Sequence, residues 1–328
     1  MSDALAEPVA ETAHPSPERL LSKDDMARER ILANIDALGL NENLRELTTL
    51  GYTVIPGVLS AEKVERAKAA ILRRVEKQTG RAVDPNKATA EDYNGMDYQN
   101  YLIFDDPVFP EILLEPKPLA LITYLLGESC LLSSMGSHFR GPGGIPLPMH
   151  VDASPVGLTE VATVANCNYA LTPYSREEGA LVITPGSHRK NRQPTPHESW
   201  MHGHQTFMEM AAQNPDPKTI DSLKWQEPAG SVTMNINPGD AVIFHGNTWH
   251  GGWRREKPGT RINLAAYFCR PHIATQELRG DDRYPEVFEH YADQPRFAQL
   301  LGENRFTGWR EEGPDYTNLA NQPTGLFD

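Results

Sequence analysis

The stretch Pro238-Gly-Asp-Ala-Val-Ile-Phe-His-Gly-Asn-Thr-Trp-His-Gly-Gly252 contains a turn, an apolar run and a second short segment that ends in paired glycines. Its opening Pro-Gly-Asp is typical of a tight turn. Ala241–Phe244 is a short apolar run bounded by turn residues, which indicates a buried strand, and Thr248–Gly251 indicates the strand that follows. Two short strands joined in this way are typical of an antiparallel sheet.

The same pattern extends over most of the C-terminal two-thirds of the chain, where β-type runs alternate with Gly- and Pro-containing turns. The expected strands are Leu131–Phe139, Leu147–Val151, Val161–Leu171, Ala180–Ile183, Ser231–Met234, Ala241–Phe244, Thr248–Gly251 and Ile262–Phe268. About eight short strands at this spacing indicate an antiparallel sandwich or barrel, and a double-stranded β-helix (a cupin-like jelly roll) fits their number.

The N-terminal third has helical character instead. The expected elements there are a helical stretch over 18–50 with a stop at Gly39, a strand at Tyr52–Ile55, a helix from the N-cap Ser60 to Thr79, and a short helix over Pro118–Leu126. The prediction is therefore a mainly β protein with flanking helices. Its expected parts are a disordered N-terminal segment over 1–17, a helical region over 18–50 and a jelly-roll domain over 51–328.

Residues 191–227 interrupt the β pattern with a segment rich in polar residues, His and Met. A connection of this length inside a compact domain is often functional, which predicts a lid-like insertion, and a surface insertion without a function is the alternative. Trp200, Phe207 and Met208 are candidates to line an apolar substrate site, or else to pack the insertion itself.

Composition excludes several classes of protein. The net charge of −13, from 31 Lys and Arg against 44 Asp and Glu, argues against a nucleic-acid-binding surface. No run approaches the roughly 20 apolar residues of a membrane span, and no signal-like start is present, so a cytoplasmic protein, monomeric or homodimeric, is expected. Cys130, Cys167 and Cys269 are an odd number without CxxC spacing, which predicts buried free thiols.

A histidine and a carboxylate lie two residues apart in Pro148-Met-His-Val-Asp152. On a strand, residues i and i+2 project from the same face, so His150 and Asp152 can reach one point. A second histidine from the distant segment quoted above, His245 or His250, would complete two nitrogens and one oxygen. That set leaves one face of an octahedral ion open and is the facial triad of non-haem Fe(II) oxygenases.

Arg261 comes after the expected strand Thr248–Gly251 and the turn Glu256-Lys-Pro-Gly-Thr260. It stands at the start of the expected strand Ile262–Phe268. A hairpin here returns Arg261 towards the metal end. Its guanidinium fork can bind a carboxylate bidentately, which a lysine would do less well. An isolated arginine beside a turn is more often a surface charge, but the neighbouring ligand pattern favours an anchor for an anionic co-substrate.

From Gly51 to about Pro271 the chain resembles the phytanoyl-CoA dioxygenase family of Fe(II)/2-oxoglutarate-dependent oxygenases. The matching segments are Leu50–Ser60 for the first strand and helix, His150-x-Asp152 for two ligands, Glu178–Arg189 for the central signature, Phe244–Gly251 for the distal histidine, and the interval to Arg261. The resemblance assigns the third-ligand role to His250 rather than to His245.

The resemblance implies Fe(II) as cofactor, with 2-oxoglutarate and O₂ as co-substrates. It implies that His150, Asp152 and His250 hold the metal and that Arg261 pairs with the far carboxylate of 2-oxoglutarate. A small organic substrate would be oxidised, most often by hydroxylation, with release of succinate and CO₂. The residues expected to help hold 2-oxoglutarate, if they do not simply belong to the sheet surface, are Ser137, Asn166 and Asn168.

The substrate class rests on a weaker pattern. A basic group could favour a carboxylate or an acyl-CoA at the pocket mouth, or could be a solvated turn; its members are Arg140, His188, Arg189, Lys190 and Arg192.

Three other functions compete. A zinc hydrolase could use His197, His202 and His204, although the first spacing is one residue longer than in the HExxH motif. A barrel without 2-oxoglutarate chemistry could bind metal or a ligand only. A cupin-type dioxygenase that does not use 2-oxoglutarate would still bind iron but would give Arg261 no role.

Overall fold

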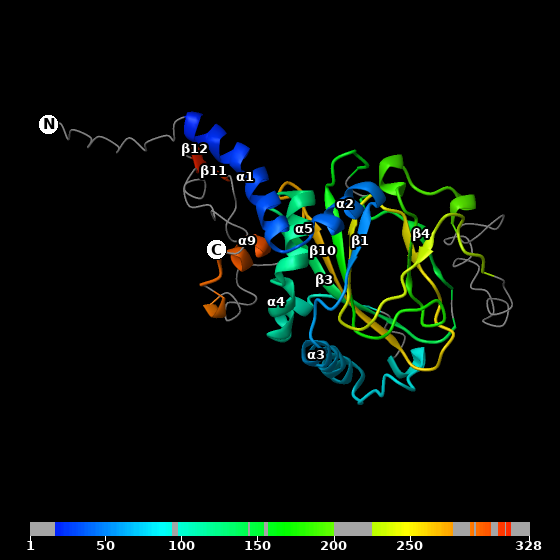
Figure 1. The fold of residues 1–328 in the computed structure, drawn as a ribbon. Coiled ribbons are helices and arrows are strands. Elements are labelled where there is room, and N and C mark those ends of the chain that lie inside the picture. The colour runs from blue at the N-terminus through cyan, green and yellow to red at the C-terminus, as the bar shows by residue number, and fades with distance from the viewer. Residues whose placement is uncertain are drawn as a thin grey trace.

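Two antiparallel sheets form the centre of the computed structural model (Figure 1), which describes residues 17–93, 98–143, 145–153, 157–199, 225–277, 289–291, 293–302, 308–311 and 313–315. The larger sheet consists of β1 (Tyr52–Ile55), β8 (Ala241–His245), β5 (Val164–Ala170), β10 (Arg261–Cys269), β3 (Leu131–Arg140) and β2 (Tyr98–Gln99), in that order. The smaller sheet consists of β4 (Leu147–His150), β9 (His250–Gly252), β6 (Leu181–Ile183) and β7 (Val232–Thr233).

The eight strands expected between residues 131 and 268 are present, each with ends that differ by a few residues. The predicted mainly β jelly roll is confirmed. Three short strands were not expected: β2, and the separate pair β11 (Gly308–Arg310) and β12 (Gly313–Asp315).

Helices flank the larger sheet (Figure 1). They are α1 (Pro17–Ala37), α2 (Asn41–Leu50), α3 (Ala61–Thr79), α4 (Val108–Leu113), α5 (Pro116–Leu126) and α9 (Pro295–Leu301), with the 3₁₀ turns η1 (Ala90–Tyr93), η2 (Leu102–Phe104), η4 (Ser187–Lys190) and η5 (Pro196–Glu198). Ser60 caps α3 as predicted, because its hydroxyl accepts from the main-chain N–H of Lys63 at 3.1 Å.

The expected helical stretch over 18–50 is two helices, since Gly39 takes a left-handed conformation with φ +70° between α1 and α2. Sequence reasoning missed α4 and α9, which have six and seven residues. Helices this short are not stable by themselves and depend on packing. The buried Phe297 and Leu300 supply that packing for α9.

The strands of the larger sheet separate two environments. On β10, Ile262, Leu264, Ala266 and Phe268 join the main hydrophobic core, which also includes buried residues of α3, α4 and α5. The alternate residues of β10, from Arg261 to Tyr267, line a cavity on the other face. The period of two therefore gives this strand one apolar face and one face available for chemistry.

Cys130, Cys167 and Cys269 are free and buried, as predicted. Within the described ranges, no helix is both long and apolar enough to cross a membrane. The N-terminal segment up to residue 16 and the lid candidates Trp200, Phe207 and Met208 lie outside the described residues.

Candidate active site

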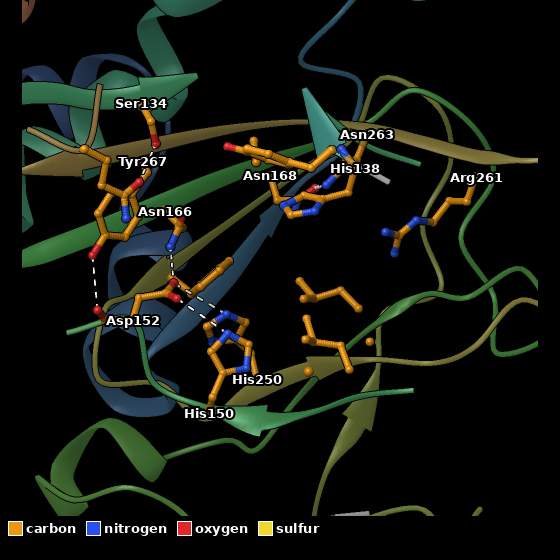
Figure 2. Close-up of a pocket in the computed structure, with 18 residues that line it drawn as sticks. Ser134, His138, His150, Asp152, Asn166, Asn168, His250, Arg261, Asn263 and Tyr267 are labelled. Atoms are coloured by element: carbon orange, nitrogen blue, oxygen red, sulfur yellow. Dashed lines mark hydrogen bonds and ion pairs between the residues drawn. The ribbon is translucent and has the colours of Figure 1, made fainter. Parts of the chain in front are cut away.

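A cavity of about 360 Å³ lies between the two sheets (Figure 2). Its lining comes from β3, β5, β8 and β10 of the larger sheet and from β4, β6 and β9 of the smaller one. A concave site of this size, with convergent polar groups, is typical of a small-molecule site.

Three potential metal ligands meet at one place in this cavity. His150 ends β4 and His250 begins β9, and the two residues are direct cross-strand partners. The Nε2 atoms of His150 and His250 lie 3.6 Å and 3.4 Å from the two carboxylate oxygens of Asp152. One ligand atom from each residue lies within 4.8 Å of the others, and no other such group of three or more occurs among the described residues.

Main-chain carbonyls orient both imidazoles. Nδ1 of His150 lies 2.9 Å from the carbonyl oxygen of Pro148, and Nδ1 of His250 lies 3.0 Å from that of Thr248. Because a carbonyl oxygen only accepts, each Nδ1 carries the proton and each Nε2 keeps its lone pair for the shared centre. Two nitrogens and one oxygen arranged in this way fit a facial-triad metal such as Fe(II).

The carboxylate of Asp152 is also held from outside the triad. The Asn166 side-chain amide donates to Oδ2 of Asp152, and the Tyr267 hydroxyl donates to the Asp152 main-chain oxygen at 3.2 Å. Burial by itself would raise the pKa of Asp152, but His250, His150 and Asn166 together hold that pKa below its usual value. Burial lowers the pKa of His250 to about 4. At neutral pH the carboxylate is therefore ionised and His250 is neutral, as metal binding requires.

His245 does not join this group. It ends β8, where Phe244 lines the cavity, so the alternating His245 side chain lies on the opposite face. Its Nδ1 accepts the N–H of Asn247 at 3.0 Å, and its ring lies 5.5 Å from that of His188. Of the two histidines that the residues alone left open, the structure brings His250 to Asp152.

Arg261 is a buried cation in the wall of this cavity. It is 6% exposed, and its Nη1 donates to the carbonyl oxygen of Gly179 at 2.5 Å. Its guanidinium carbon lies 5.2 Å from the centre of the Tyr174 ring, while its Nε has no partner. No carboxylate within the described part of the chain pairs with it. A buried guanidinium with unused donors is suited to a carboxylate ligand.

A second polar group adjoins Arg261. The Asn168 side-chain oxygen accepts from the Tyr174 hydroxyl at 3.2 Å and from the Asn263 amide at 3.1 Å. The Asn263 side-chain oxygen accepts the main-chain N–H of His138 at 2.8 Å. These contacts fix the orientation of the two asparagine side chains that line the cavity.

Two of the three residues expected to contact 2-oxoglutarate, Asn166 and Asn168, line the cavity, and Ser137 does not. On β3 the residues that line it are Ser134 and His138, so Ser137 has the opposite parity and is fully buried on the other face. Ser137 therefore lies behind the cavity wall, and the expected contact of Ser137 with 2-oxoglutarate does not fit this placement.

The basic group that suggested an anionic substrate lies elsewhere. Arg189 donates to the carbonyl oxygen of Thr48, while Lys190 and Arg192 pair with Glu198 at 3.4 Å and 2.7 Å. None of these three, nor His188, lines the cavity. The Arg140 side chain lies outside the described part of the structure.

The proposed zinc cluster receives no support. His197 is an exposed residue of η5, and His202 and His204 lie outside the described residues.

Sequence reasoning missed several residues that line the cavity: Tyr98, Ser134, His138, Asn263, Tyr267 and Gln276. The period of two could have identified Asn263 and Tyr267, which share a strand face with Arg261. Tyr98 and Gln276 come from segments whose approach to the sheet has no sequence signal.

Comparison with known proteins agrees with this geometry. The family model described as phytanoyl-CoA dioxygenase (PhyH) matches residues 48–262. The chain belongs to the phytanoyl-CoA dioxygenase family. The family resemblance noted over Gly51–Pro271 is thereby confirmed. As a family member, the chain is a non-haem iron, 2-oxoglutarate-dependent dioxygenase that uses O₂ and acts on a small molecule.

The individual relatives and solved structures described next share between 17% and 27% of their residues with this chain. The dioxygenase af480 of Aspergillus fumigatus is 27% identical over 247 residues, which is 72% of this chain and 69% of that protein. An ectoine dioxygenase of Stutzerimonas stutzeri is 24% identical over 237 residues, covering 68% of this chain and 74% of that one. The 2-oxoglutarate-dependent carbocyclase SnoK of nogalamycin biosynthesis shares the fold with a TM-score of 0.50 at 20% identity, over 74% of this chain and 94% of that one.

The structure of HygX from Streptomyces hygroscopicus with nickel and 2-oxoglutarate bound also has a TM-score of 0.50, at 17% identity, and covers 72% of this chain and 88% of that one. The phytanoyl-CoA dioxygenase fold is thus common to enzymes with different substrates, and the substrate of this chain must be inferred from its own cavity.

Proposed function

We propose that this dioxygenase hydroxylates a small organic substrate, that His150, Asp152 and His250 hold its iron, and that Arg261 anchors 2-oxoglutarate. The observation that supports the proposal is the convergence of three ligand atoms within 4.8 Å, in the same cavity as a buried guanidinium without an anion. Either feature alone could be structural. Together they provide places for a metal and for a dicarboxylate.

Iron at this site supplies the one-electron chemistry that couples oxidative decarboxylation of 2-oxoglutarate by O₂, to succinate and CO₂, to oxidation of a substrate C–H bond. The protein contributes positioning and exclusion of water. The carbonyls of Pro148 and Thr248 place the proton of each neutral imidazole on Nδ1, which leaves the two Nε2 atoms for the metal, and Asn166 fixes the carboxylate of Asp152. His150, Asp152 and His250 all line the cavity, where co-substrate and substrate would have access to the metal.

The far carboxylate of 2-oxoglutarate would pair with Arg261, whose donors Nε and Nη2 have no protein acceptor among the described residues. Arg261 is held against Tyr174 and the carbonyl of Gly179, so little side-chain freedom remains to be lost when the carboxylate binds. The adjoining Asn168 and Asn263 form a polar wall of this end of the cavity.

The test is an anaerobic titration of the metal-free protein with Fe(II) and 2-oxoglutarate. The titration is monitored through the weak visible charge-transfer band of the chelate. The band should require both additions and should disappear in His150→Ala. In Arg261→Ala it should appear only at much higher 2-oxoglutarate concentration. If iron does not bind, or if the band in Arg261→Ala forms at the wild-type concentration, the respective assignment is wrong.

A further inference from the structure

The end of the cavity away from Arg261 has its own set of polar residues. On β10 the inward-facing residues run from Arg261 to Tyr267, a distance of about 20 Å at roughly 3.3 Å per residue. Tyr267 pairs with Ser134 of β3 and with Asn166 of β5. Figure 2 shows Ser134 and Tyr267 at the upper left, above Asp152, and Arg261 at the right. A co-substrate at Arg261 leaves this end free.

A hydrogen-bonded pair lies at the mouth of this end. The Ser134 hydroxyl donates to the Gln276 side-chain oxygen at 2.6 Å, and the Gln276 main-chain N–H donates to the Ser133 hydroxyl at 2.9 Å. Gln276 is exposed although it lines the cavity. With its oxygen engaged, its amide N–H groups are the part that remains for a ligand.

Tyr98 lies beside Ser134 at this mouth. It is 37% exposed, and its ring centre lies 4.5 Å from that of His138, its cross-strand partner. Gly136 makes this packing feasible, because a Cβ there would clash with the Tyr98 ring and would lie 2.5 Å from the main-chain oxygen of Gln99. The wall is therefore formed before any ligand binds, which lowers the entropic cost of binding.

Outside the triad and Arg261, the lining of the cavity is made of polar and apolar side chains that include one histidine, His138. Its other lining residues are Tyr98, Ser134, His138, Leu147, Asn166, Asn168, Leu181, Phe244, Gly251, Gly252, Asn263, Ala265, Tyr267 and Gln276. Within the described chain, none of these is Lys, Arg, Asp or Glu. A ligand charge that lies inside the cavity at this end would have no Lys, Arg, Asp or Glu side chain of the lining to pair with, which is unfavourable. An apolar acyl chain would leave the polar side chains without hydrogen bonds, which is also unfavourable.

We propose that this end, formed by Tyr98, Ser134, Tyr267 and Gln276, is a substrate subsite for a small neutral molecule that carries hydroxyl or amide groups, rather than for a carboxylate or an acyl-CoA. This assignment rests on the proposed function, because it takes the Arg261 end to be the place of 2-oxoglutarate. The Gln276 amide donates to a substrate oxygen at the mouth, and the Tyr98 ring packs against the body of the substrate.

The test is a ligand-observed NMR binding assay on the metal-free, full-length chain. The panel contains small neutral polyols, glycosides and cyclic amides, the amine and carboxylate analogues of the same scaffolds, and octanoyl-CoA. Each compound is also measured on Arg261→Met, which removes the cation that would attract carboxylates, and only binding that persists there is assigned to the subsite. Neutral members should bind more tightly than their carboxylate analogues and than octanoyl-CoA.

Substitutions of Gln276 test whether the measured binding occurs at this subsite. Gln276→Leu should weaken neutral ligands about 3- to 10-fold, because one hydrogen bond between uncharged groups is lost. Gln276→Glu should shift the preference towards the amine analogues, because it introduces a carboxylate at the same position. Arg189→Ala is the matched control, since Arg189 belongs to the basic group outside the cavity and should leave every affinity unchanged.

The proposal is overturned if carboxylates or octanoyl-CoA bind in preference, if no neutral compound binds at millimolar concentration, or if both Gln276 variants bind the panel like the wild type. The assay does not need iron. If the Fe(II)/2-oxoglutarate band fails to form, the proposed function fails and the NMR result still decides the subsite. If the band forms and no neutral compound binds, only the subsite fails.

Discussion

Replacing Arg261 with methionine should move stability and co-substrate affinity in opposite directions. Arg261 is 6% exposed, makes one hydrogen bond, to Gly179, and has no anionic partner among the described residues. Without 2-oxoglutarate it is a buried charge that is only partly compensated. Removing such a charge while keeping an apolar stem is neutral or stabilising, so the free energy of unfolding of the metal-free protein should stay the same or rise by about 1–2 kcal/mol.

The affinity for 2-oxoglutarate should fall sharply in the same variant. A bidentate pair between a guanidinium and a carboxylate consists of two charge-assisted hydrogen bonds, and losing both costs roughly 3–4 kcal/mol, or about 150- to 1,000-fold in Kd. Arg261→Lys keeps the charge but not the fork. About half of that free energy should be lost, which is roughly a 10- to 30-fold weaker Kd.

Denaturant unfolding of the metal-free protein gives the stability, and anaerobic 2-oxoglutarate titration of the Fe(II) form gives the affinity. Arg255→Met is the matched control. Arg255 is 9% exposed and does not line the cavity, and its side chain donates to the main-chain carbonyls of Glu178, Lys257 and Pro258. It should lose about 1–3 kcal/mol of stability and keep its 2-oxoglutarate affinity. Wild-type 2-oxoglutarate affinity in Arg261→Met would refute the anchoring role.

Three further changes test other parts of the site. Asn166→Ala removes the amide that holds Asp152 and should weaken Fe(II) binding about 10- to 100-fold in a metal titration; unchanged affinity would mean that Asp152 needs no support. Gly136→Ala places a Cβ 2.5 Å from the Gln99 main-chain oxygen and should cost about 1–3 kcal/mol in a denaturant melt, so a neutral result would contradict the close approach of β2. Burial lowers the pKa of His245 from 6.5 to about 4, so the unfolded chain binds this proton more readily than the folded chain. The contribution of His245 to stability is therefore full above about pH 6.5 and falls by about 3 kcal/mol as the pH drops towards 4, and His245→Gln should flatten this part of the stability–pH curve of the metal-free protein.

Much of the fold follows from local pattern. The eight strands between residues 131 and 268 are bounded by Gly and Pro turns, and each strand needs only its own residues and its punctuation to be recognised. The N-cap Ser60 and the stop at Gly80 likewise define α3 from a few neighbouring residues. The short helices α4 and α9 have no comparable signal, because they exist through contacts with distant residues.

The candidate site follows from the sequence only in part. The two-residue spacing of His150 and Asp152 and the fork of Arg261 are properties of residue type and local geometry, so they could be predicted, although β4 ends at His150 and Asp152 follows it in a turn. The sequence could not show which face of β3 carries the Ser137 side chain, because the register of β3 against β10 decides which residues face the cavity.

The sequence by itself determined the mainly β class, and it predicted the ligand types and the co-substrate anchor, because each depends on residue type and local spacing. The residues alone left His245 and His250 open, the family resemblance favoured His250, and the tertiary structure brings His250 to Asp152. Only the tertiary structure decided that the basic group at residues 188–192 lies away from the cavity and that Tyr98 and Gln276 line it at an exposed edge. These features depend on how two sheets and remote loops pack. The physical reason is that a cavity is lined by residues from many segments, and its charge and shape exist only after those segments have come together.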